Sequence, residues 1–266
     1  MDIRTSAPTR KRRGTPGRAL AAGGGAVLLA LALTGCGSTD VDDAPVERKA
    51  FALEGKTLTI DAEDSTVTLV PADVEEVEVE RRVDGWVFLG SGPDPVWTMK
   101  DDTLTLRVKC GAMISNCAAW HEVKVPRGVT VQADADNGEI TAANFDTELR
   151  LSADNGNIVV RDSGGPLDLK SDNGTVLAER IGTKSVVARA DNGEIRLEFA
   201  GVPDLVDAVS ENGSVVIDLP RGGQKYAVNA SADNGEVDIA VPRSDSSAHV
   251  VKVRSDNGEV KVRSAN

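Results

Sequence analysis

Large aromatic side chains are scarce in this chain of 266 residues, which has four Phe, three Trp and one Tyr. Globular cores usually depend on such rings for buried area, and nucleic-acid grooves use them as stacking platforms. Basic residues are also in the minority, with 30 Lys and Arg against 42 Asp and Glu, which disfavours binding to a phosphate backbone. The composition therefore argues against an ordinary globular enzyme and against a nucleic-acid-binding protein, and the 26 Gly indicate many turns.

The chain also lacks the motifs of common catalytic sites. Its two histidines, His121 and His249, have no motif around them, and we expect His121 to be a surface or cap residue. A G-x-S-x-G nucleophile elbow, an H-E-x-x-H motif and a phosphate-binding Gly loop are all missing from the sequence. We therefore assign no catalytic residue and no cofactor, and we expect no enzyme activity.

Residues 1–35 have the layout of a bacterial secretory signal. Four basic residues at 10–13 precede an apolar stretch at 19–33, which is short for a membrane-spanning helix. The stretch ends in Leu33-Thr34-Gly35-Cys36, which resembles the lipobox of bacterial lipoproteins, where the cysteine is lipidated and becomes the mature N-terminus. We predict a lipid anchor on Cys36 that holds the protein at the extracytoplasmic face of the cell membrane. The sequence leaves Sec and twin-arginine export both open.

Two cysteines remain once Cys36 is assigned to the lipid. Cys110 and Cys117 have six residues between them, and outside the cytoplasm we predict a disulfide bond across this loop. A redox or metal-binding pair is the alternative, but C-x-x-C spacing and neighbouring histidine ligands do not support it. Residues 36–47 are polar, small and acidic, and we expect them to form a flexible tether.

One motif, an acidic residue followed by Asn-Gly, occurs seven times in the second half of the chain. Its asparagines are Asn137, Asn155, Asn173, Asn192, Asn212, Asn234 and Asn257. Aliphatic residues stand six and four positions before each asparagine and five after it, and a small residue stands two before. This alternation on both sides of a turn predicts two short strands per repeat with one buried face. A degenerate eighth copy fits residues 58–69, with Asp64-Ser65 in place of Asn-Gly.

The repeats could form either the coils of a solenoid or the hairpins of a meander. A hairpin would oppose like charges across its strands, for example Asp136 and Glu139, which is destabilising. Coils of 18 to 23 residues instead close on themselves and stack their aliphatic side chains inward. We therefore predict an all-β, single-stranded β-solenoid over residues 131–266, with an irregular N-terminal β cap over residues 48–130. We expect the last strand, at 260–262, to lie at an edge that Lys261 and Arg263 protect from aggregation.

Two features of this pattern leave alternatives open. The acid before each asparagine repeats on every coil, so we interpret it as a turn-former that accepts backbone N–H groups. The alternative hypothesis is a ladder of carboxylates that binds Ca²⁺ weakly.

Trp86, Trp97 and Trp120 all lie in the irregular segment 71–130. They either fill the cap or form, with the disulfide loop, a surface that binds a partner.

The lipobox, the Asn-Gly strand repeats, the Val-Pro-Arg-Gly turn at 125–128 and the two-cysteine loop together resemble a bacterial family, the toast-rack putative adhesins. This resemblance covers residues 48–266 and implies a β-strand-repeat domain of unknown function. We expect a non-enzymatic binding or scaffold protein of the cell envelope, with another envelope protein, a wall polymer or a neighbouring cell as its partner. An envelope-stress sensor or modulator is the alternative function, followed by a carbohydrate-active β-helix enzyme.

Overall fold

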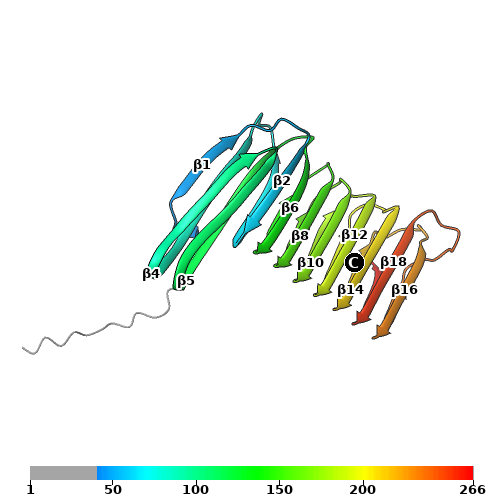
Figure 1. Ribbon diagram of the computed structural model, residues 1–266. Helices are drawn as coiled ribbons and strands as arrows, with labels where there is room; N and C mark the ends of the chain where they lie inside the picture. The colour runs from blue at the N-terminus through cyan, green and yellow to red at the C-terminus, as the bar shows by residue number, and fades with distance from the viewer. Residues whose placement is uncertain (1–40, 266) are drawn as a thin grey trace, which may run out of the picture. The chain divides into compact units, whose positions relative to one another are not determined.

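Each repeat forms two short strands joined at a corner in the computed structural model, which describes residues 41–265 except the side chains at 88–89 and 112–115 (Figure 1). The strands before the corner are β6 (Thr130–Asn137), β8 (Leu149–Asn155), β10 (Leu167–Asn173), β12 (Ser185–Asn192), β14 (Leu205–Asn212), β16 (Ala227–Asn234) and β18 (Val250–Asn257). The strands after it are β7 (Ile140–Ala143), β9 (Ile158–Arg161), β11 (Val176–Ile181), β13 (Ile195–Phe199), β15 (Val215–Leu219), β17 (Val237–Ala240) and β19 (Val260–Ser264). We call these two rows of strands the first wall and the second wall.

Neighbouring repeats stack through parallel strand pairing within each wall. Asn137 lies in register with Asn155, and Asn155 with Asn173, so the repeat aligns from coil to coil. Hairpins of a meander would instead pair their strands antiparallel. The predicted β-solenoid is therefore confirmed. Its core lies between the walls, where aliphatic side chains such as Leu169 and Ile195 are completely buried.

The remaining elements lie before these repeats. They are a 3-10 helix η1 (Val41–Asp43) and strands β1 (Val46–Phe51), β2 (Thr57–Glu63), β3 (Ser65–Ala72), β4 (Val77–Lys100) and β5 (Thr103–Pro126). β2 and β3 pair parallel to β6 and β7, which aligns Ile60 with Ala133 and Leu69 with Ala142. The predicted eighth copy of the repeat is therefore confirmed, and the first coil lies within the segment 48–130. No helix in the part of the chain that the structure describes is long and apolar enough to cross a membrane.

A long antiparallel ribbon of β4 and β5 covers the end of this first coil. β5 pairs parallel to β2 through residues 103–107 and to β3 through residues 119–126, while β1 adds antiparallel to β4. At this end Phe51 and Trp97 pack edge to face with ring centres 6.3 Å apart, and the Arg81 guanidinium lies 3.8 Å from the Trp97 ring centre. Trp97 therefore fills the cap, as one of the two interpretations of the tryptophans predicts.

The Asn-Gly corners are held together by contact between backbones. A Cβ atom added to any of the seven glycines would lie 1.8 to 2.3 Å from a carbonyl oxygen of the neighbouring coil. Among these motifs only Gly138 has a positive φ, at 144°. The sequence suggests a different reason for Asn-Gly, namely tolerance of positive φ by both residues. The structure instead requires glycine because any side chain would push two coils apart.

The asparagine side chains form a continuous hydrogen-bonded ladder along the corners. The Asn192 Nδ2 donates to Asn173 Oδ1 at 3.1 Å, and the Asn212 Nδ2 donates to Asn192 Oδ1 at the same distance. The ladder starts at Asp64, whose carboxylate accepts a 2.9 Å hydrogen bond from Asn137 Nδ2. The asparagine of the motif therefore specifies the register between coils.

Replacing Asn192 by alanine should cost about 1 kcal/mol of unfolding free energy, because it removes two exposed hydrogen bonds of the ladder. Denaturant unfolding of the Asn192→Ala variant measures this loss. Asp168→Ala is the control, since Asp168 is an exposed strand residue of β10 outside the ladder. Equal unfolding curves for the two variants would contradict a role of the ladder in stability.

The spatial order of the last three repeats differs from their order in the sequence. β18 lies between β14 and β16, and β19 lies between β15 and β17, so the final repeat is inserted before the penultimate one (Figure 1). The expectation that strand 260–262 lies at an edge is therefore wrong. Lys261 and Arg263 belong to an internal strand, where Arg263 pairs with Asp218 at 2.6 Å. The edge of the solenoid is formed by β16 and β17.

Candidate functional site

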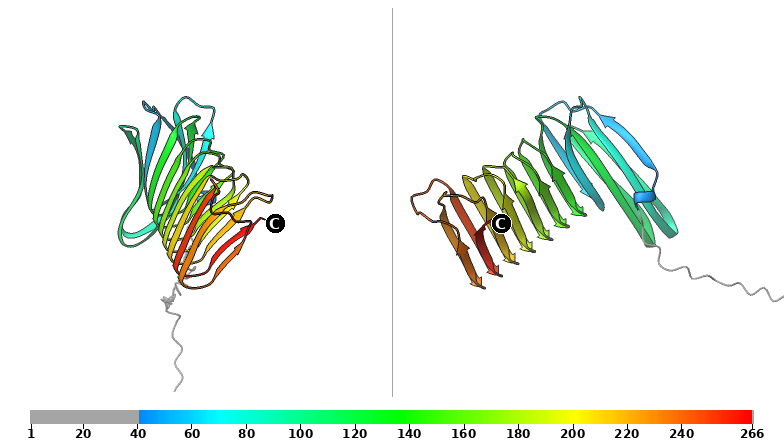
Figure 2. Two further views of the ribbon diagram at one scale, coloured as in Figure 1. Left: turned by 90° about the vertical axis from the view of Figure 1, so that its right-hand side faces the viewer. Right: turned by 180° about the vertical axis from the view of Figure 1, so that it is seen from behind.

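The ribbon of β4 and β5 continues well past the corner between β2 and β3 (Figures 1 and 2). β2 and β3 are separated by Asp64 alone, whereas the two parts of β5 that pair with them are separated by residues 108–118. These residues pair antiparallel with residues 84–95 of β4, and the two strands bend together. We call residues 84–95 and 108–118 the arm.

The composition of the arm differs from that of the rest of the chain. Three of its 23 residues are charged, namely Asp84, Asp94 and Lys109, whereas 27% of the whole chain is charged. Both strands carry an apolar run where the arm bends, at residues 86–89 and 112–114. Trp86 is 44% exposed, the largest exposed fraction among the large hydrophobic side chains of the described residues. Trp86 thus gives the arm an exposed apolar side chain within a segment that carries little charge.

A disulfide bond and close backbone packing hold the arm in shape. Cys110 and Cys117 are joined across the bend of β5, with their Cα atoms 6.6 Å apart. On the neighbouring strand, a Cβ atom at Gly85 would lie within 3 Å of the Asn116 carbonyl oxygen and of Cys117 Sγ. Glycine at position 85 therefore allows β4 to pack directly on the disulfide, one residue away from Trp86.

Removing the disulfide in a Cys110→Ser/Cys117→Ser variant should lower the stability of the arm against local opening by about 2 kcal/mol, since the short loop is no longer closed. Hydrogen exchange should become faster in the arm. Exchange in residues 149–199 should stay unchanged, because coils of a solenoid interact only with their neighbours. Unchanged exchange in the arm would contradict a stabilising role for the bond.

The other two tryptophans lie against arginines of the cap. Trp97 is stacked with Arg81, as described above, and Trp120 has the Arg82 guanidinium 5.0 Å from its ring centre. Both rings are half-buried. Trp86 is therefore exposed on the arm, whereas Trp97 and Trp120 pack against arginines of the cap. The sequence pattern does not reveal this difference, because all three tryptophans lie in the same irregular segment.

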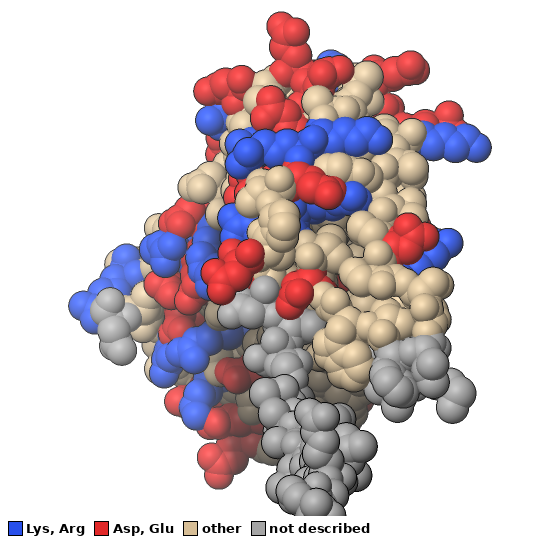
Figure 3. Space-filling model, turned by 90° about the vertical axis from the view of Figure 1, so that its left-hand side faces the viewer, with Lys and Arg blue, Asp and Glu red and all other residues tan. Residues whose placement is uncertain are grey.

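Basic side chains gather in a band across the end of the cap, between acidic ones (Figure 3). A pocket of about 300 Å³ lies beside them on β1, β4 and β5, lined by Arg48, Lys49, Ala50, Glu78, Val79, Glu80 and Lys124. Its charges are partly satisfied internally, since Arg48 pairs with Glu80 at 2.8 Å. The pocket has mixed charge and does not define a specific ligand.

His121 and Ser65 form a buried pair inside the cap. The Ser65 Oγ lies 2.6 Å from His121 Nδ1, and the two residues are 2% and 0% exposed. Burial lowers the pKa of His121 to about 4, and the nearby Arg81 cation acts in the same direction. A substrate cannot reach a serine and histidine that are enclosed in this way. His121 is therefore a cap residue, as expected, but it is not on the surface.

The second histidine has a different environment near the other end of the solenoid. His249 Nδ1 lies 2.8 Å from the Pro203 carbonyl oxygen and 3.2 Å from Asp204 Oδ1. Its ring also meets Tyr226 edge to face, with centres 6.2 Å apart. These contacts fix the segment that leads into β18, and they give His249 a structural role.

The acids before the asparagines do not act as the turn-formers that we expected. No backbone N–H among the described residues donates to their carboxylates, because corner amides bond between coils, as from Gly193 N to Asn212 O at 3.0 Å. Three of these acids instead pair with bases: Asp172 with Lys170, and Asp233 and Asp256 with Arg254. No group of three potential ligands among His, Cys, Asp and Glu occurs in the described part of the chain. The geometry therefore gives no support to the calcium ladder.

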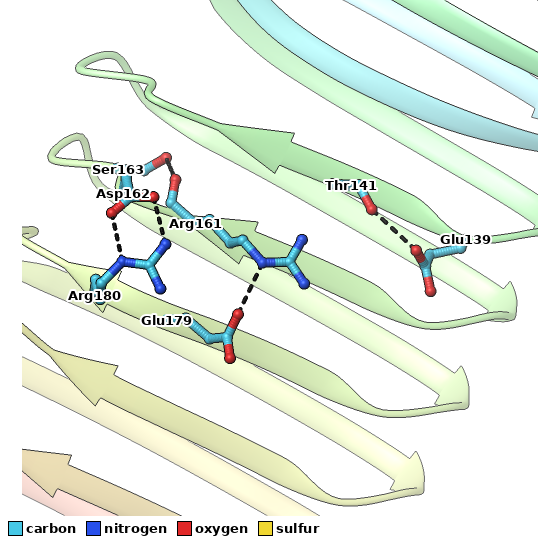
Figure 4. Close-up of polar contacts among 7 residues, drawn as sticks. All are labelled: Glu139, Thr141, Arg161, Asp162, Ser163, Glu179 and Arg180. Atoms are coloured by element: carbon cyan, nitrogen blue, oxygen red, sulfur yellow. Dashed lines mark hydrogen bonds and ion pairs between the residues drawn. The ribbon is translucent and has the colours of Figure 1, made fainter.

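Ion pairs also connect neighbouring coils on the outer face of the second wall (Figure 4). Arg161 binds Glu179 at 2.8 Å, and Arg180 binds Asp162 with distances of 2.8 and 2.6 Å. The hydrogen bond from Arg180 holds the pKa of Asp162 below its usual value. Such exposed pairs contribute little stability. In these two pairs each acid is matched by a base, so the four residues add no net charge to the second wall.

These features define a β-solenoid with two strands per coil, a capped first coil and a disulfide-closed arm. The chain belongs to the Toastrack DUF4097 family, whose model matches residues 55–263. A search of the curated proteins gave no match.

Solved structures to which this chain is similar include a putative cell adhesion protein from Clostridium sporogenes, 12% identical, with a TM-score of 0.39 over 84% of this chain and 100% of that one. A putative adhesin from Bacteroides fragilis is also 12% identical, with a TM-score of 0.37 over 82% of this chain and 96% of that one. A putative adhesin from Parabacteroides merdae is 14% identical, with a TM-score of 0.35 over 83% and 98%.

Proposed function

We propose that this protein is a non-enzymatic, lipid-anchored binding protein at the extracytoplasmic face of the bacterial cell membrane. The solenoid serves as a rigid spacer, and the arm contacts another protein of the envelope. The exposed Trp86 on a disulfide-closed, weakly charged ribbon is the observation that carries this proposal. Cys36, the residue proposed to carry the lipid, lies outside the described residues.

The chemistry of the arm favours a protein partner. Tryptophan is enriched among the residues that dominate protein interfaces, and charged residues are depleted from interface cores. A ribbon fixed by a disulfide and by strand pairing loses little conformational entropy when it binds. A charged wall polymer would require a charged surface, and three charges in 23 residues do not provide one.

Crosslinking in intact cells tests the arm as the contact element. Trp86→Ala should reduce the recovery of crosslinked envelope proteins at least about tenfold, because a central aromatic contributes about 2 kcal/mol or more to binding. Val46→Ala is the matched control, since Val46 is 41% exposed but lies on β1 outside the arm. Equal recovery with both variants, or recovery of wall polymer alone, would contradict the proposal.

Cell fractionation tests the anchor separately. The Cys36→Ala variant should carry no lipid and should not be processed normally. The loss of the lipid is measured as a loss of labelling with fatty acid, and the altered processing as a shift in the size of the protein. A variant that still incorporates fatty acid would contradict lipidation at Cys36. The result does not depend on the arm, so the two parts of the proposal can fail independently.

A further inference from the structure

The solenoid ends in an open coil formed by β16 and β17. β16 pairs only with β18 and β17 only with β19, so their outer edges have no strand partner in the described part of the chain. Side chains that face the core are also uncovered here. Val237 is 42% exposed, whereas Val215 and Val260 at the same position of neighbouring coils are completely buried.

The two ends of the solenoid differ in how far other strands cover them. At the first coil, β1, β4 and β5 cover both walls and bury residues such as Val77 and Val79. At the last coil, β16 and β17 contain no Lys, no Pro and no bulge, and their only charged residues are Asp233 and Asp238. Terminal repeats of solenoids usually require a polar cap for solubility. The outer edges of β16 and β17 are therefore available for pairing with another chain.

We propose that a second copy of this protein covers this end, with β16 pairing antiparallel to β16 of the other copy and β17 to its β17. A two-fold axis perpendicular to both walls produces this arrangement. It joins the two solenoids into one continuous stack, pairs the free strand edges and buries Val237 and Ile239 of both copies. Two-fold dimers of this self-complementary kind are the commonest protein oligomers.

The charges of the open coil match this arrangement. Its corner end carries the exposed acids Asp233, Glu236 and Asp238, and its opposite end carries the exposed bases Lys225 and Arg243 together with one exposed acid, Asp245. Antiparallel pairing brings the corner end of one copy against the opposite end of the other. In the register that aligns Asn229 with Asn229 of the second copy, Asp233 lies directly opposite Lys225 of that copy.

The same charges argue against the other symmetric arrangement of two open ends. A two-fold axis along the strands would pair β16 with β17 of the second copy and place both corner ends together. Asp233, Glu236 and Asp238 would then face the same acids, and like charges opposed across strands are destabilising. Charge therefore selects the axis perpendicular to the walls.

Cysteine crosslinking of the full chain in membranes tests the register. Asn229→Cys should form a disulfide-linked dimer under mild oxidation, because the two residues face each other across the axis. Lys252→Cys is the matched control, since Lys252 is exposed and adjacent to Asn229 on β18, one strand further from the axis. Its two copies would lie too far apart for a disulfide. Equal crosslinking of both variants, or crosslinking of the Asn229→Cys variant only to a different protein, would overturn the proposal.

Sedimentation of the full chain in density-matched detergent tests the charges. The wild type should have the mass of a dimer, and Lys225→Glu should weaken dimerisation about tenfold, since two symmetric contacts become repulsive. The double variant Lys225→Glu/Asp233→Lys should restore part of it, because the exchanged charges again meet across the axis while the pair between Asp233 and Arg254 within each chain is lost. A monomeric wild type, or a double variant weaker than the single one, would overturn the proposal.

Discussion

Replacing Gly193 by alanine should lower the unfolding free energy of the solenoid by at least about 3 kcal/mol. The added Cβ atom would lie 1.9 Å from the Gly174 carbonyl oxygen and 2.6 Å from its carbon. Both atoms belong to backbone that is hydrogen-bonded between coils, for example from Gly174 N to Asn192 O at 3.1 Å. The neighbouring coil therefore cannot move away without breaking the register of the stack.

Denaturant unfolding followed by circular dichroism measures this effect. Gly182→Ala is the control, because a Cβ atom there has no atom within 4 Å and the residue has an ordinary φ. We expect it to change the unfolding free energy by less than about 1 kcal/mol. A Gly193→Ala protein as stable as Gly182→Ala would show that the corners are looser than the structure indicates.

Acidification should destabilise the protein through His121 by about 3 kcal/mol between pH 7 and pH 4. Burial, together with the Arg81 cation, lowers the pKa of this residue to about 4 in the folded protein. The unfolded chain takes up the proton near pH 6.5, before the folded protein does. The neutral His121 therefore contributes its full stabilisation above about pH 6.5. This stabilisation is lost as the pH falls from 6.5 to 4, and it does not change further below about pH 4.

A His121→Gln variant isolates this effect, since glutamine can still bond to Ser65 but does not titrate. Its unfolding free energy should fall less than that of the wild type between about pH 7 and pH 4. Carboxylates such as Asp162, whose pKa is lowered, act at the acidic end of this range and affect both proteins equally. Parallel pH profiles for the two proteins would contradict a neutral, buried His121.

Much of the fold could be predicted because every repeat presents the same side-chain pattern. The alternation around each Asn-Gly fixes which residues face the core, and even the degenerate copy at 58–69 pairs as the pattern predicts. The order of the last repeats could not be predicted in this way. Identical patterns allow any repeat to stack on any other, so the pattern contains no information on spatial order. The only signal is the longer spacing from Asn212 to Asn234 and from Asn234 to Asn257, which leaves room to skip a coil.

The candidate site can be predicted only in outline. The sequence marks Trp86 and the two cysteines as members of an irregular segment, but it does not reveal the arm itself. Apart from Val108, no described side chain of the arm is buried, so the arm lacks the alternating buried residues that mark a strand in the repeats. A drop in charge at residues 84–95 and at residues 108–118 is the available signal. The burial of His121 with Ser65 depends on the register between β3 and β5, which a sequence pattern does not contain.

The insertion of β18 and β19 between earlier coils has a consequence for the order in which the chain can fold. Coils up to β15 can add one after another as the polypeptide emerges, since each one finds its neighbour already in place. The coil of β16 and β17 emerges next but has no correct surface to join until residues 250–264 follow. This coil must stay undocked until then, or it must dock temporarily on β14 and β15 and later be displaced by β18 and β19. The native stack can therefore form only after the last repeat, residues 250–264, has been synthesised.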